Sequence, residues 1–85
     1  MPVISRFFGI IIMMYYRDHN PPHFHARYGD YEVIISLNGK ILEGKFLKRA
    51  LQLVTEWLNI HKEELIDNWN KTQNGEPLNS IAPLE

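Results

Sequence analysis

The fold is decided by residues 23–39, HFHARYGDYEVIISLNG, which contain two strand-like segments and two turn signals. Gly29-Asp30 and Asn38-Gly39 are dipeptides that favour two-residue β-hairpin turns. A turn at Gly29-Asp30 pairs Tyr28 with Tyr31, Arg27 with Glu32, Ala26 with Val33, and His25 with Ile34. Continuing through the second turn into a short strand at residues 40–43 places Glu43 beside Ile34.

This register assigns the side chains of the hairpin to two faces, because successive strand residues point in opposite directions. One face is apolar and carries Phe24, Ala26, Tyr28, Tyr31, Val33, Ile35 and Leu37. The other is polar and carries His23, His25, Arg27, Glu32 and Ser36. We therefore expect the core to lie on the first face and the histidines to stand on the second, pointing away from it.

The rest of the chain supplies further strands and then helix. Residues 3–7 and 10–16 are rich in β-branched and aromatic side chains, which predicts two strands. From Phe46 apolar residues recur every three or four positions, as in an amphipathic helix. Either one helix runs from Phe46 to about Lys71, or Asn59 ends a first helix and His61 caps a second, which we favour. Trp57 and Trp69 are expected to be core anchors.

The predicted fold class is α+β: a small, N-terminal antiparallel sheet of four or five strands, with one or two C-terminal helices packed on one face. We expect a single domain over residues 1–85. It comprises a sheet region with a histidine loop (1–44), a helical region (45–73) and an extended tail (74–85). Gly75 and Pro77 should end the helical region. The apolar residues of the tail should fold back over the edge of the core; these are Leu78, Ile81 and Leu84.

Composition excludes several classes of protein. The 85 residues include no cysteine, so neither a disulfide nor a thiolate metal site is available. The net charge of −1 gives no global basic field for nucleic acid. The apolar run at residues 10–16 is too short to span a membrane and lacks signal-peptide flanks. We expect a cytoplasmic protein without membrane contact. Because residues 10–16 are apolar on both alternating sets, we also predict a homodimer.

Chemistry is concentrated in residues 18–25, DHNPPHFH. His23 and His25 are two apart on a strand, so both rings leave the same face. His19 lies across the Pro21-Pro22 turn and can curl back toward them. Three histidines with an open fourth position are typical of catalytic zinc sites. The metal hypothesis therefore takes His19, His23 and His25 as ligands of a divalent metal such as zinc, with Asp18 as an orienting group or ligand.

A metal-free hypothesis uses the same segment. His19, His23 and His25 can serve as catalytic acid and base, and Arg27 can stabilise a phosphate, as an RNA-cleaving enzyme requires. A third interpretation is structural: Asp18 and His19 satisfy turn amides, and Arg27 forms an ion pair with Glu32. These alternatives remain open on sequence alone.

Residues 15–26, YYRDHNPPHFHA, resemble the signature of a small prokaryotic family catalogued as domain of unknown function 4160. The resemblance extends through residues 50–57, residues 65–69 and the tail ending in residues 81–84. It implies a two-gene arrangement similar to toxin–antitoxin modules, with a small antitoxin-like partner and RNA as a target. Our leading hypothesis is a toxin-like or regulatory component acting on RNA through the histidine site. The alternative is a non-catalytic metal- or protein-binding module.

Overall fold

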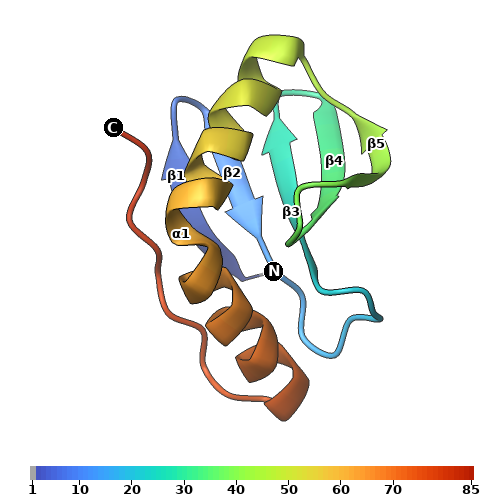
Figure 1. The fold of residues 1–85 in the computed structure, drawn as a ribbon, viewed down its shortest axis with the longest axis vertical. Coiled ribbons are helices and arrows are strands. Elements are labelled where there is room, and N and C mark those ends of the chain that lie inside the picture. Colours follow the sequence, from blue (N-terminus) through green and yellow to red (C-terminus); the bar gives the residue numbers. More distant parts are fainter. Residues whose placement is uncertain (1) are drawn as a thin grey trace.

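The computed structural model describes residues 2–85 and contains one five-stranded antiparallel sheet and one long helix, which confirms the predicted α+β class. The strands follow chain order across the sheet. Helix α1 lies across one face of the sheet and extends beyond the ends of the strands, toward the loop between β2 and β3 (Figure 1). The elements are β1 (Val3–Phe7), β2 (Ile10–Met13), β3 (His23–Tyr28), β4 (Tyr31–Ser36), β5 (Ile41–Lys45) and α1 (Lys48–Asn74).

The predicted register of the β3–β4 hairpin is confirmed. Tyr28 pairs with Tyr31 and His25 with Ile34, and Ile34 also pairs with Glu43 of β5. Gly29 in the turn has a φ of 59°, a left-handed conformation that glycine adopts without strain. Tyr31 is a correction: it was assigned to the core face but is 43% exposed. Its position beside the turn carries it past the end of the packed region.

The core lies between α1 and the apolar face of the sheet, as predicted. Phe24 is fully buried and its ring meets that of Trp57 at a centroid distance of 5.9 Å. Trp57 also packs on Phe7, at 5.4 Å. Burying a phenylalanine side chain such as Phe24 stabilises the fold by about 1.5–3 kcal/mol. Both tryptophans are core anchors, since Trp57 is fully buried and Trp69 is 5% exposed.

Strand β2 is shorter than the predicted strand over residues 10–16, because it ends at Met13. Beyond Met13, which pairs with both Val3 and His25, the neighbouring strands offer no further paired residues. Tyr15 instead lies over the polar face of the sheet, with its hydroxyl 4.0 Å from the Met13 sulfur. Burial of Met13 therefore does not require a second copy of the chain, which was the basis for expecting a homodimer.

Helix α1 combines the two predicted alternatives. It is continuous over Lys48–Asn74, but His61 has non-helical backbone angles (φ −112°, ψ 23°) that mark a kink. The His61 Nδ1 atom lies 2.6 Å from Glu64 Oε1 in the next turn. Gly75 ends the helix as predicted, in a left-handed conformation whose N–H donates to the Lys71 carbonyl.

The tail after α1 folds back over the edge of the core, as predicted (Figure 1). Ile81 is 3% exposed, and its N–H donates to the Ile4 carbonyl at the edge of β1. The Trp57 indole N–H donates to the Ala82 carbonyl at 2.9 Å, which joins the tail to the centre of the helix. Within residues 2–85, no helix is both long and apolar enough to cross a membrane.

Candidate metal centre

The loop between β2 and β3 is held against the C-terminal half of α1. Arg17 has a left-handed backbone conformation (φ 56°), and its N–H donates to the Thr72 carbonyl at 3.1 Å. The Gln73 side chain donates to the Asp18 carbonyl at 3.3 Å. At the other end of the loop, the Leu37 N–H donates to the Pro22 carbonyl at 3.0 Å. These contacts fix the loop on both sides and orient the Asp18 side chain toward the start of β3.

The Asp18 carboxylate is the centre of the site, because three histidines surround it. Its Oδ2 atom lies 2.9 Å from His23 Nε2 and 3.5 Å from His25 Nε2. Its Oδ1 atom lies 3.0 Å from His19 Nδ1 and accepts the His19 backbone N–H at 2.9 Å. One ligand atom each from Asp18, His23 and His25 lie within 4.8 Å of one another. The structure thus brings together three of the four side chains of the metal hypothesis.

His23 is buried, contrary to the expectation that it would stand on an open polar face. It is 3% exposed, and its ring packs 5.2 Å from the ring of Trp69. The physical reason is that α1 and the loop extend past the end of the sheet and enclose the first residue of β3. Removing this side chain therefore leaves a hole in packed structure, unlike the loss of an exposed residue.

The hydrogen bonds of His23 determine the state of its ring. Nδ1 lies 2.7 Å from the Pro21 carbonyl oxygen, which can only accept, so Nδ1 carries a proton. Nε2 then faces Asp18 Oδ2 at 2.9 Å. A neutral ring would put a lone pair against a carboxylate there. A cation between Nε2 and Oδ2, either a second proton on the ring or a metal ion, would remove this repulsion.

His25 is the least satisfied polar side chain of the site. Both of its ring nitrogens are inaccessible to solvent, and neither has a hydrogen-bond partner among residues 2–85. Carboxylate oxygens lie 3.5 Å away on each side, from Asp18 at Nε2 and from Glu32 at Nδ1, but without hydrogen-bond geometry. Leaving a buried polar atom unpaired costs about 1–3 kcal/mol. A bound cation at Nε2 would remove part of that cost.

Electrostatics keep Asp18 ionised. Partial burial alone would raise the pKa of its carboxyl group. Hydrogen bonds from the His19 amide and the His23 ring, the charge of His23 and a smaller contribution from His25 outweigh burial, so the pKa is lowered from its ordinary value. Asp18 is therefore an anionic oxygen donor at neutral pH, the form in which carboxylates bind metals.

The other predicted site residues lie at the margin. His19 is outside the cluster of ligand atoms, and its side chain is 86% exposed. Arg27 lies on the same face as His25, but its guanidinium is paired with Glu32, with Nη2 and Oε1 3.2 Å apart. This confirms the predicted cross-strand ion pair. It also leaves Arg27 directed at Glu32 instead of at Asp18.

Sequence reasoning missed several residues that shape the site. Tyr15 covers His25 edge-on, with ring centroids 4.6 Å apart. Trp69 packs on His23, and the Pro21 carbonyl orients that ring. Glu32 was recognised only as the partner of Arg27, although it also approaches His25. None of these contacts follows from periodicity, because a turning loop or the far end of α1 provides most of them.

The family described as "Domain of unknown function (DUF4160)" matches residues 9–70, which include the whole candidate site. The chain belongs to this family, and the family predicted from the sequence is confirmed. No curated protein and no solved structure matches the chain. The family description carries no activity, so an assignment of function depends on the geometry of the site.

Proposed function

We propose that this chain is a divalent-metal-binding module. Its family description assigns no activity. Asp18, His23 and His25 are the proposed ligands, and zinc is the metal that this donor set suits. The observation that carries the proposal is the convergence of three ligand atoms within 4.8 Å, one of them on the unpartnered, buried ring of His25. A satisfied structural cluster would leave no such buried nitrogen without a partner.

The distances within the site support this proposal. Zinc bonds to histidine nitrogen and carboxylate oxygen of about 2.0–2.1 Å give neighbouring ligand atoms a separation of about 3.3 Å in a tetrahedron. The two contacts of Asp18 Oδ2, 2.9 Å to His23 and 3.5 Å to His25, lie on either side of that value. Both of these distances are therefore compatible with coordination of one ion, and all three ligand atoms lie within 4.8 Å of one another.

The surroundings of both histidines also suit a metal site. A metal-bound histidine commonly donates its other ring N–H to a carbonyl or carboxylate, which fixes the ring and its tautomer. His23 has the Pro21 carbonyl in that role, 2.7 Å from Nδ1. His25 has the Glu32 carboxylate beside Nδ1, at 3.5 Å, and Arg27 holds Glu32 in turn. The Pro21 carbonyl thus directs His23 Nε2 toward Asp18, and Glu32 lies on the corresponding side of the His25 ring without a hydrogen bond.

Three protein ligands leave one position for water or substrate, an arrangement that catalytic zinc sites share. A zinc ion held by these residues would supply a water whose pKa is lowered to about 7. The His19 side chain is 86% exposed, and its Nδ1 atom lies 3.0 Å from Asp18 Oδ1. With Nδ1 at Asp18, the Nε2 atom of this exposed ring can accept or donate a proton. Hydrolysis is the reaction class that this combination supports.

A second candidate is metal-free cleavage of RNA by His19, His23, His25 and Arg27, in a toxin-like component of a two-gene module. One observation favours it: the Asp18–His19 pair has the form of an oriented, solvent-exposed acid–base group. Burial of His23 and the pairing of Arg27 with Glu32 weigh against it. Cytoplasmic location, a homodimer and an antitoxin-like partner belong to this candidate as further proposals.

Metal analysis of protein purified without a histidine tag tests the leading proposal. We expect close to one zinc per chain, or one-to-one uptake by stripped protein in calorimetry. Asp18→Asn and His25→Gln should abolish uptake, whereas the matched changes Asp30→Asn and His61→Gln should not. Wild-type protein that takes up no divalent metal would overturn the proposal. RNA cleavage or growth inhibition that survives chelation but is lost in His19→Ala would then favour the second candidate.

A further inference from the structure

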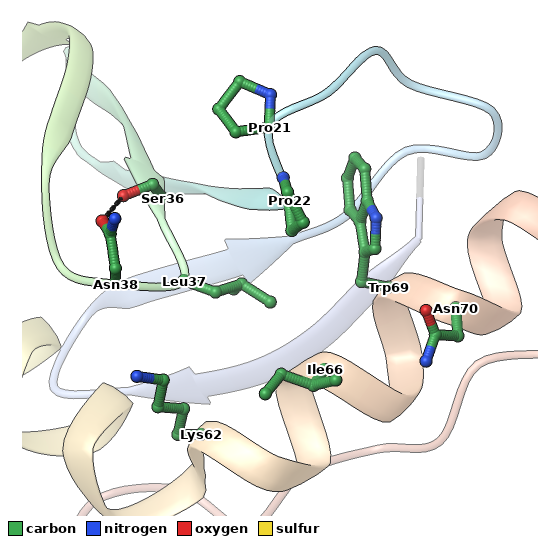
Figure 2. Close-up of a pocket in the computed structure, with 9 residues that line it drawn as sticks. All are labelled: Pro21, Pro22, Ser36, Leu37, Asn38, Lys62, Ile66, Trp69 and Asn70. Atoms are coloured by element: carbon green, nitrogen blue, oxygen red, sulfur yellow. Dashed lines mark hydrogen bonds between the residues drawn. The ribbon is translucent and has the colours of Figure 1, made fainter.

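A second concave surface is lined in part by the Pro21-Pro22 turn and by none of the proposed metal ligands. It is a groove of about 370 Å³ between α1 and the turns that flank β3 and β4 (Figure 2). Pockets for small organic ligands have volumes of about 300–1,000 Å³, so this groove is large enough for one small molecule. Its lining residues are Pro21, Pro22, Ser36, Leu37, Asn38, Lys62, Ile66, Trp69 and Asn70.

The walls of the groove are formed mainly by rings and aliphatic side chains. Figure 2 shows the Trp69 indole beside Pro22, with Ile66 below them on α1. Ile66 is 43% exposed, an apolar side chain that the fold itself leaves uncovered. Trp69 is 5% exposed, so the accessible ring surface is mainly that of the two prolines, and such flat surfaces favour planar aromatic partners. The shape and chemistry of the walls therefore point to a planar, largely apolar ligand.

One charged group lines the groove, and it is positive. Lys62 extends from α1 at the edge of the groove (Figure 2). Within residues 2–85, no carboxylate oxygen lies within 4.0 Å of its amino group. The other polar side chains of the lining are neutral: Ser36, Asn38 and Asn70. The Ser36 hydroxyl already donates a hydrogen bond to the Asn38 side chain. An anionic group on the ligand is thus the complement that the groove lacks.

We propose that this groove binds a planar aromatic ligand that carries one acidic group, with Lys62 facing the acid and Trp69, Pro22 and Ile66 facing the ring. The groove shares Trp69 and Pro21 with the surroundings of His23 but none of its lining residues is a proposed metal ligand. The proposal therefore stands or falls separately from metal binding.

The test uses two dyes with the same rings and different charge. Anilinonaphthalene sulfonate is anionic and N-phenyl-1-naphthylamine is neutral, and each is titrated into the full chain with a chelator present. We expect the anionic dye to bind with one-to-one stoichiometry. Lys62→Gln should weaken it by up to about fivefold, the range of one exposed ion pair, and leave the neutral dye unchanged. The control Lys48→Gln, on the same helix but outside the groove, should alter neither.

A second variant tests the ring-binding wall. Ile66→Glu introduces a polar, negative group at an exposed position and should weaken both dyes, the anionic one more, while circular dichroism shows an intact fold. Naphthalene sulfonate should displace the bound dye, and methanesulfonate at the same concentration should not. Binding that neither Lys62→Gln nor Ile66→Glu alters would overturn the proposal. So would the absence of dye binding by the folded chain, which is the result expected if a protein surface covers the groove instead.

Discussion

The two faces of the β3–β4 hairpin are buried by different means. On one face, Phe24 and Val33 are closed off by α1, and the contacts are apolar and non-directional. On the other, His25 is enclosed by the edge-on ring of Tyr15 and by the loop that carries Asp18, whose carboxylate lies 3.5 Å from His25 Nε2. The first arrangement supplies stability through burial. The second places ligand atoms close together, but it leaves both ring nitrogens of His25 without a hydrogen-bond partner among residues 2–85.

The largest effect is expected on the apolar face. Phe24→Ala should lower the free energy of unfolding by about 3–5 kcal/mol, because it leaves a cavity beside Trp57. Urea denaturation followed by tryptophan fluorescence measures the loss. The neighbouring His25→Ala change should cost clearly less, since that ring makes no hydrogen bond. Equal losses for the two variants would mean that the faces do not differ as we describe.

His23 is expected to show an intermediate effect. His23→Ala should cost about 1–3 kcal/mol, because it leaves the Pro21 carbonyl without its donor and opens space beside Trp69. The same denaturation experiment applies, in the presence of a chelator so that metal does not contribute. A variant as stable as the wild type would show that this ring is not enclosed, and would restore the expectation of an open polar face.

Metal affinity should respond to Glu32, which lies outside the ligand set. Glu32→Gln should weaken zinc binding about 10- to 100-fold by removing the carboxylate beside His25 Nδ1. Stability should change little, because the Glu32 side chain is 41% exposed. Calorimetric titration of zinc gives the affinity, and Glu43→Gln on the adjacent strand is the matched control. Equal zinc affinities for both variants would show that Glu32 does not contribute to metal binding.

The smallest effect is expected at His19. Its side chain is 86% exposed, so His19→Ala should change the free energy of unfolding by no more than about 0.5 kcal/mol. Zinc affinity should also be nearly unchanged, because this ring lies outside the cluster of ligand atoms. A loss of affinity comparable to that of His25→Gln would instead identify His19 as a metal ligand, as the sequence alone predicted.

The hairpin could be predicted from the sequence because its determinants are local. The turn residues Gly29-Asp30 fix the register, and alternation then assigns Phe24 and His25 to opposite faces. The helix was predictable for a similar reason, because its apolar residues recur every three or four positions. The kink at His61 explains why the sequence was compatible both with one continuous helix and with two helices that meet near this residue.

The enclosure of the site could not be predicted, because it depends on contacts between distant segments. Gln73 and Asp18, which are 55 positions apart, meet only because α1 extends past the sheet. Tyr15 covers His25 because β2 ends at Met13, and no turn signal marks that end. The histidine cluster was thus recognisable as a group, whereas the burial of His23 and the exposure of His19 required the structure.

The most direct test of the metal proposal is X-ray absorption at the zinc edge of protein loaded with one equivalent of zinc. We predict two imidazole ligands with zinc–nitrogen distances of about 2.0–2.1 Å and the remaining first-shell positions filled by oxygen. Asp18→Asn should disturb this pattern or prevent loading. A spectrum with no imidazole scattering, or one left unchanged when His23 and His25 are both replaced, would contradict a centre built from Asp18, His23 and His25.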